Sequence, residues 1–196
     1  MIHRQPAVTH PPDHLPNPSR RHFLRLGIVF SASLALPGSL YAALTPADHQ
    51  ERRLVFFNTH TREKLDVCYA QGQSYRPDAL AAVNHILRDH RTNDIKPIDT
   101  RLLDLLYDIR SRAGRHACVH IISGYRSPRT NRILRKRSHG VARKSLHMKG
   151  HAADIRIPGI STDRLRRIAA DLKQGGVGYY PRANFVHVDI GSVRSW

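Results

Sequence analysis

The sequence predicts a single α+β domain built on a largely antiparallel sheet, with a targeting segment in front of it. Strand-like runs stand near both ends of residues 53–190, and segments with helical spacing of apolar residues separate them. The chain contains no internal repeat. With 196 residues, of which 40% are hydrophobic, it is long enough for one core and a leader.

The first half of the domain is predicted to be a β-hairpin followed by two helices. Residues 53–58 and 64–70 are rich in β-branched and aromatic side chains, and the short polar link T-H-T-R-E joins them. A helix is expected to begin at Pro77, because proline is favoured at the first helical position. A second helix is expected to begin near Asp99 and to end at Gly114, with leucines on its apolar face.

The second half alternates strands and helices. Turn residues and helix-capping residues separate its apolar runs, and these mark where each element begins and ends. In chain order we expect a strand at 117–123, a helix from Ser127-Pro128, a strand at 151–157, a helix from Ser161 or Thr162 to Gly175-Gly176, and strands at 177–180 and 185–190.

The first 42 residues have the pattern of an export signal. Residues 1–18 are rich in Pro and His and lack apolar periodicity, which predicts disorder. The following S-R-R-H-F-L-R resembles a twin-arginine signal, and the apolar run at 26–36 is shorter than the roughly 20 residues that a membrane span needs. We therefore expect a signal peptide at 1–42, a working domain at 43–196 in the periplasm, and no stable membrane span after processing. An uncleaved anchor is the alternative.

The chain is strongly basic, with a formal net charge of +17. Residues 1–42 hold four Arg and one Asp, so +14 of this charge belongs to residues 43–196. Nucleic acid, an anionic membrane surface and an acidic polymer such as cell-wall peptide are the partner classes that this charge suggests. No zinc-finger spacing or basic tract with interleaved aromatics is present, which disfavours nucleic acid. A solvated basic surface that attracts polyanions weakly is the other interpretation.

Two cysteines, Cys68 and Cys118, are too few for a disulfide-built fold or a cysteine zinc site. Both lie in apolar, strand-like runs, where buried free thiols are the usual outcome. A single bridge stays open for an exported protein, since bridging depends on the separation of the two Cα atoms.

Two short clusters carry candidate metal ligands. The stretch S-L-H-M-K-G-H-A-A-D contains His147 and Asp154, and the turn expected at Gly150 can fold these two residues back onto one point. The later F-V-H-V-D contains His187 and Asp189, which are two apart on a strand and so share a face. Two imidazoles and a carboxylate are a recurrent ligand set for a hydrolytic zinc that leaves the fourth position to water.

Other residues compete for a role at this site. The chain has 14 histidines, and His139 and His151 flank the first cluster. His151 follows His147 by four residues, the spacing of a helical zinc pair, but Gly150 and the strand-like run after it disfavour a helix. Arg126 lies between a strand end and a helix start, a corner that often holds functional side chains. A purely structural arginine is the alternative.

Three motifs together resemble the M15 zinc peptidases. They are S-G-Y-R-S at 123–127, S-x-H-x-x-G-x-A-x-D at 145–154 and H-V-D at 187–189. The likeness is greatest to the murein endopeptidase K branch, and it extends through G-G-V-G-Y-Y-P-R-A-N-F-V-H-V-D-I-G. It covers essentially the whole of residues 43–196. The resemblance implies the zinc D-alanyl-D-alanine-peptidase-like (hedgehog/DD-peptidase) fold, with Zn²⁺ as cofactor.

The resemblance also implies roles for single residues. His147, Asp154 and His187 match the zinc ligands, and Arg126 matches the arginine that holds the scissile carbonyl or its oxyanion. Many members carry a carboxylate general base three residues before the last histidine, where this chain has Asn184. Either Asp189 takes that role, or the metal alone acidifies its bound water sufficiently. We favour Asp189 as the base or as a residue that orients a ligand.

The implied function is hydrolysis of peptide cross-links in peptidoglycan during cell-wall remodelling. The bond is either the L,D or the D,D cross-link, and the substrate is the peptidoglycan stem peptide, whose free carboxylates would attract a basic domain. We also expect a monomer that binds no nucleic acid. Because Asn184 cannot accept a proton, the alternative is an exported peptidoglycan-binding module that keeps the fold without turnover.

Overall fold

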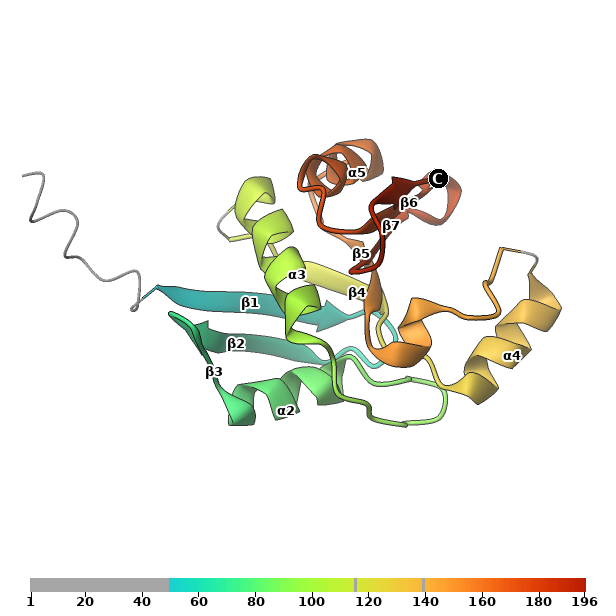
Figure 1. Cartoon of the computed structure of the whole chain (residues 1–196), viewed down its shortest axis with the longest axis horizontal. Coiled ribbons are helices and arrows are strands. Elements are labelled where there is room, and N and C mark those ends of the chain that lie inside the picture. The colour runs from blue at the N-terminus through green and yellow to red at the C-terminus, as the bar shows by residue number, and fades with distance from the viewer. Residues whose placement is uncertain (1–49, 115, 139) are drawn as a thin grey trace, which may run out of the picture. The chain divides into compact units, whose positions relative to one another are not determined.

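The computed structural model describes residues 50–114, 116–138 and 140–196, and the expected signal peptide at 1–42 lies outside them. The described part is an α+β fold in which eight strands form one sheet, in the order β3-β2-β1-β4-β5-β7-β6-β8 (Figure 1). None of its helices is long and apolar enough to cross a membrane.

Each strand and helix that the sequence predicted is present in the described residues. The strands are β1 (Glu51–Asn58), β2 (Lys64–Gln71), β3 (Ser74–Tyr75), β4 (Val119–Ser123), β5 (Ala152–Arg156), β6 (Gly176–Tyr180), β7 (Phe185–Asp189) and β8 (Arg194–Ser195). The helices are α2 (Pro77–Ile86), α3 (Thr100–Ala113), α4 (Pro128–Arg137) and α5 (Thr162–Asp171), with the short 3₁₀ helices η2 (Leu146–Lys149) and η3 (Pro181–Ala183). The two-residue strands β3 and β8 were not expected, because a strand that short has no periodicity to detect.

One helix boundary was predicted wrongly. Helix α5 ends at Asp171 rather than at Gly175-Gly176, and Lys173 already has a positive φ of 53°. The glycine at 175 serves another purpose, since a Cβ there would overlap the backbone carbonyl of Asp189 on β7. It permits a close approach of two chain segments and does not cap the helix.

The sheet is largely antiparallel, as expected. Only β1 with β4 and β6 with β8 pair in parallel among the described strands. The parallel pair β1 and β4 is separated in sequence by the β2–β3 hairpin and by helices α2 and α3, which supply the long crossover that parallel strands need.

One hydrophobic core joins the sheet to the helices. Helix α3 buries Leu102, Leu106 and Ile109, the stripe that its spacing predicted. Val83 of α2 and Leu165 of α5 are also fully or almost fully buried in this core. The interior is therefore filled mainly by aliphatic side chains together with the aromatic Phe56 and Tyr69.

Both cysteines are free thiols and partly buried. Cys68 lies on β2, and Cys118 immediately precedes β4, while β1 runs between these two strands. Two strand spacings amount to about 9–10 Å, which exceeds the roughly 7 Å limit on Cα separation in a disulfide. The fold therefore excludes the Cys68–Cys118 bridge that the sequence left open.

Candidate metal centre

The pairing of β5 with β7 places Asp154 opposite His187. These strands are antiparallel neighbours, and their register pairs Asp154 with His187 and Ala152 with Asp189. Directly opposed residues in an antiparallel pair project their side chains to the same face, so the carboxylate and the imidazole meet. The alternation along β7 then puts Asp189 on that face as well.

His147 reaches the same point because the chain reverses between η2 and β5. Gly150 ends η2 with a φ of 75°, and the His151 backbone amide donates to the Leu146 carbonyl at 3.1 Å. A side chain at Gly150 would be strained at this φ, and its Cβ would overlap the Pro97 carbonyl oxygen. The glycine in the S-x-H-x-x-G-x-A-x-D motif is therefore required by the backbone.

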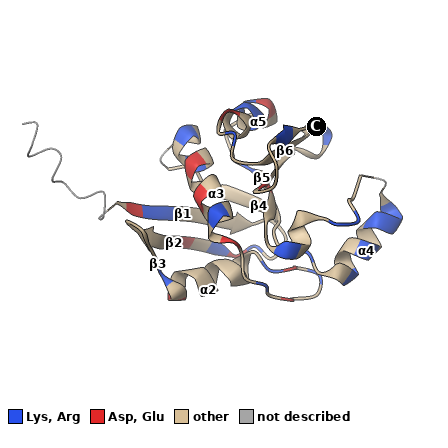
Figure 2. Cartoon of the chain, in the orientation of Figure 1, with Lys and Arg blue, Asp and Glu red and all other residues tan. Residues whose placement is uncertain are grey.

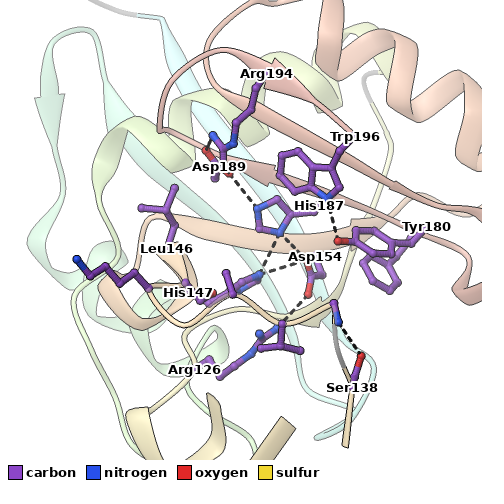
Figure 3. Close-up of a pocket in the computed structure, with 16 residues that line it drawn as sticks. Arg126, Ser138, Leu146, His147, Asp154, Tyr180, His187, Asp189, Arg194 and Trp196 are labelled. Carbon is purple, nitrogen blue, oxygen red and sulfur yellow. Dashed lines mark hydrogen bonds and ion pairs between the residues drawn. The ribbon is translucent and has the colours of Figure 1, made fainter. Parts of the chain in front are cut away.

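Three donor atoms converge at this point (Figure 3). His147 Nε2 lies 3.2 Å from Asp154 Oδ1 and 3.1 Å from His187 Nδ1, and His187 Nδ1 lies 2.8 Å from Asp154 Oδ1. Ligands about 2.0–2.1 Å from a tetrahedral zinc ion are about 3.3 Å apart. The three atoms therefore fit a zinc ion with only a small outward movement. His147 and Asp154 are 2% and 7% exposed, so the centre is mostly shielded from solvent.

Each imidazole is oriented by the nitrogen that faces away from the centre. His147 Nδ1 donates to the Gly124 carbonyl oxygen at 2.7 Å, and His187 Nε2 donates to Asp189 Oδ2 at 3.0 Å. Because carbonyl and carboxylate oxygens only accept, these outer bonds can hold the single hydrogen of each neutral ring on His147 Nδ1 and His187 Nε2. In that tautomer the nitrogens that face Asp154 present their lone pairs to a metal ion.

The Asp189 carboxylate is fully buried, and both of its oxygens accept hydrogen bonds. The backbone amides of Gly176 and Gly191 donate to its Oδ1 at 3.2 and 2.8 Å, and Arg194 donates to Oδ2 at 2.6 Å. Burial opposes its ionisation, but the hydrogen bonds from His187, Arg194 and Gly191 outweigh it and hold the pKa of Asp189 well below its usual range. Asp189 is therefore a permanent anion whose oxygens are all engaged.

Arg126 faces the centre from the opposite side to Asp189. Its Nη2 lies 3.4 Å from Asp154 Oδ2 and 3.3 Å from Ser123 Oγ, and its side chain is 11% exposed. Within the part of the chain that the structure describes, its Nε–H is buried and has no acceptor. Burial lowers the pKa of Arg126, and the Asp154 carboxylate opposes that shift. Arg126 also lines the cavity described below, so its guanidinium is placed beside any substrate bound there.

The donors lie in a cavity of about 500 Å³. One wall is aromatic. The Trp196 ring lies beside the His187 ring, tilted by 48° with centroids 5.3 Å apart, and donates from Nε1 to the Tyr180 hydroxyl at 3.0 Å. The sequence did not indicate a role for Trp196 or Arg194, since the C-terminal S-V-R-S-W has no recognisable motif. Tyr180 lies in the quoted G-G-V-G-Y-Y-P-R run, but nothing there assigned it to the site. The placement of Trp196 and Arg194 depends on β8 pairing with β6, which is a long-range contact.

The competing residues lie elsewhere. His151 points to Asp99, with Nε2 3.7 Å from Oδ2, and is not part of the donor cluster. His139 lies outside the described residues. The Asn184 side chain accepts from the Thr162 hydroxyl at 2.8 Å and is not among the residues that line the cavity. Of the carboxylates in the described residues, only those of Asp154 and Asp189 line it.

Known proteins match nearly the whole described region. A protein-family model described as peptidoglycan L,D-endopeptidase MepK matches residues 46–196. The chain is 44% identical over 178 residues to the peptidoglycan L,D-endopeptidase MepK of Escherichia coli strain K12, covering 91% of this chain and 97% of that one. It is 38% identical over 179 residues to the probable enzyme of the same name from Haemophilus influenzae, covering 91% and 95%.

Proposed function

We propose that this chain, which belongs to the M15 peptidase family described as peptidoglycan L,D-endopeptidase MepK, cleaves L,D cross-links with a zinc ion held by His147, Asp154 and His187. That it is a murein endopeptidase and a metallopeptidase follows from the family and from the 44% identity. The observation that carries the metal assignment is the convergence of three donor atoms within 4.8 Å of one another. The choice of L,D over D,D bonds rests on the names of the relatives.

The residues around the centre have separate roles in amide hydrolysis. A zinc ion bound there supplies the Lewis acidity that activates water and polarises a carbonyl. Arg126 adds a fixed positive charge beside Asp154 and lines the cavity, so its guanidinium can stabilise the substrate oxygen that becomes negative during attack. Fixed donors of this kind stabilise the transition state more than the ground state.

We assign Asp189 a positioning role and not that of general base. All of its oxygens accept hydrogen bonds from the chain, and it contacts the centre only through His187 Nε2. A carboxylate on the far side of a ligating histidine fixes the ring and raises its basicity. Asn184 takes no part in this proposal, because its side chain is bonded to Thr162.

Digestion of purified muropeptide dimers tests the function. Residues 43–196 are incubated with an L,D-linked dimer and, separately, with a D,D-linked dimer, and mass analysis follows the products. We expect the L,D dimer to be cleaved faster, chelation to stop cleavage and added zinc to restore it. If neither dimer is lost under any metal condition, the chain is instead the non-catalytic peptidoglycan-binding module.

We propose that residues 1–42 are a twin-arginine signal peptide and that residues 43–196 act in the periplasm as a monomer with the zinc D-alanyl-D-alanine-peptidase-like fold. The S-R-R-H-F-L-R pattern and the start of the family match at residue 46 support this division. Replacing Arg20 and Arg21 by lysine is expected to leave the protein in the cytoplasm, which fractionation would detect. Periplasmic recovery of this variant would contradict the twin-arginine assignment.

A further inference from the structure

Residues 128–144, here called the basic arm, consist of helix α4 and the loop that follows it. Between Arg126 and Ala153 the chain contains no Asp or Glu. The basic arm itself carries seven cations: Arg129, Arg132, Arg135, Lys136, Arg137, Arg143 and Lys144. Figure 2 shows this helix in blue without red, whereas α5 carries both signs. Half of the domain's net charge therefore lies in one short segment.

The charges of the basic arm are exposed and uncompensated. All seven side chains are exposed, and none lies within 4.0 Å of a carboxylate in the part of the chain that the structure describes. Helix α5 has the same length, yet its Asp163 pairs with both Arg166 and Arg167. The basic arm thus lacks the internal pairing found on a comparable helix of the same domain.

Helix stability does not account for this pattern. Cations in the last turn, such as Arg135, are favoured by the helix dipole. However, Arg129 lies in the first turn, where a cation is disfavoured, and Arg132 is spaced three residues from both Arg129 and Arg135. Like charges at this spacing repel one another and weaken a helix. The arrangement therefore indicates an anionic partner that offsets the repulsion.

The basic arm is anchored at the metal centre and extends away from the other helices (Figure 1). Helix α4 buries only Thr130 and Asn131, and it begins directly after Arg126. The Asp89 carboxylate accepts from the Ser127 amide at 2.9 Å, and Asn131 donates to the Ala142 carbonyl at 3.1 Å. These bonds hold the helix start and the loop together, while the charged face stays open to solvent.

The loop of the basic arm forms one rim of the metal-site cavity. Ser138, Gly140, Val141, Ala142 and Lys144 all line it. An anionic polymer that binds along α4 would therefore lie next to the cavity that holds the donor cluster. The substrate polymer must reach the cavity of a peptidase, whereas a membrane surface or a nucleic acid need not. A basic surface that adjoins this cavity therefore favours the substrate as its partner.

We propose that the basic arm binds the free carboxylates of peptidoglycan stem peptides beside the scissile bond. This inference rests on the proposed function and adds a substrate-binding surface to it. The cations act on the substrate outside the reacting centre, so they strengthen binding of the ground state and the transition state equally. Such uniform binding lowers KM and leaves kcat unchanged.

Two triple variants that lose the same charge test the basic arm. The first is Arg129→Gln, Arg132→Gln and Arg135→Gln; the control is Arg164→Gln, Arg167→Gln and Lys173→Gln, three exposed cations on and just after α5. Glutamine is a good helix former, so both variants should fold, which thermal melting checks. A further triple variant, which replaces Arg129, Arg132 and Arg135 by lysine, keeps the charge and should behave like the parent protein.

Binding is measured first in a His147→Ala background, which removes hydrolysis. Sedimentation with intact sacculi at about 50 mM salt should show a Kd roughly tenfold higher for the α4 triple, since each exposed charge pair contributes modestly. The control triple should stay within about twofold, and high salt should abolish the difference. Equal binding by the two triples, or a difference that persists on sacculi whose carboxylates have been amidated, would overturn the inference.

Kinetics in the active background separate this inference from the proposed function. With a soluble L,D-linked dimer, the α4 triple should raise KM at unchanged kcat, and a fall in kcat instead would contradict the binding role. Vesicles of anionic phospholipid serve as the competing partner: loss of vesicle binding without loss of sacculus binding would assign the basic arm to a membrane. If no protein hydrolyses any dimer, the proposed function fails while the sacculus result still decides the role of the basic arm.

Discussion

At the residue scale, the metal centre is held by side chains that each have one fixed partner outside it. His147 is tied to the Gly124 carbonyl and His187 to Asp189, so neither ring can rotate away without breaking a buried hydrogen bond. Two tests follow from this arrangement, one on the donors themselves and one on a residue behind them.

Removal of either ligating imidazole is expected to abolish metal binding. His147→Ala and His187→Ala should each reduce zinc from about one ion per chain to almost none, because two protein ligands hold zinc poorly. His151→Ala is the matched control: it removes an imidazole four residues from His147 that points to Asp99 instead. Metal analysis after dialysis measures the stoichiometry. Loss of zinc in the His151 variant alone would reverse the ligand assignment.

Asp189→Asn is expected to keep zinc bound but to slow turnover by about 10–100-fold, the usual cost of losing the partner of a ligating histidine. The amide cannot hold the charge that faces His187 Nε2 and Arg194. Zinc content and kcat are measured together, and a thermal melt checks that the buried site still folds. A variant with unchanged turnover would remove Asp189 from the function altogether.

At the element scale, the start of α4 connects the hydrophobic core to the site. Ser127 caps this helix by accepting from the Thr130 amide at 3.2 Å, and Asp89 in turn accepts from the Ser127 amide. Arg126 is the residue before this cap, so the anchoring of the helix also fixes where the guanidinium lies. Asp89 is only 1% exposed, which makes it a buried charge held entirely by hydrogen bonds.

Asp89 should make the stability of the domain fall in acid. Burial opposes its ionisation, yet hydrogen bonds from the backbone amides of Ser127 and Arg91 lower its pKa to about 2. A carboxylate with a depressed folded pKa stabilises above its unfolded value near 3.8 and loses that contribution as pH falls towards 2. We expect about 2 kcal/mol from this group at neutral pH.

Urea unfolding of the parent protein and of Asp89→Asn at several pH values measures this contribution. The variant should be less stable at pH 6, and the gap between the two proteins should close as the pH approaches 2. Asp163→Asn on α5 is a suitable control, since its carboxylate forms only partly exposed pairs with Arg166 and Arg167. A gap that stays constant with pH would show that Asp89 does not act through its charge.

At the scale of the whole molecule, the metal centre joins three segments that are far apart in the sequence. His147 comes from η2, Asp154 from β5 and His187 from β7. An ion that binds only the folded chain stabilises it by mass action, by about 4 kcal/mol at a free concentration a thousandfold above Kd. For a domain of this size such a change corresponds to a Tm shift of roughly 8–16 °C.

Chelation is therefore expected to lower the Tm by about this amount, and scanning calorimetry with and without chelator measures it. His147→Ala provides the control, because a chain that binds no zinc should melt at the same temperature in both conditions. A large chelator effect on that variant would locate the stabilising ion elsewhere in the molecule.

By itself, the sequence determined the order of the elements and the donor set. Apolar spacing, proline at Pro77 and caps such as Asp99 and Ser127 are local signals, and side-chain period and backbone capping depend only on neighbouring residues. The three candidate donors His147, Asp154 and His187 were likewise predicted from their motifs together with Arg126, and the structure brings the four side chains together.

Only the tertiary structure decided how these parts meet. The register of β5 with β7, the return of Trp196 to the cavity and the burial of Asp189 among Gly176, Gly191 and Arg194 are contacts between distant segments, which no local pattern records. The same applies to Asn184, whose side chain accepts a hydrogen bond from Thr162 of α5 and does not line the cavity. Strand pairing and packing decide which partner each polar group contacts. They therefore decide which side chains face the centre as donors and which side chains hold those donors in place.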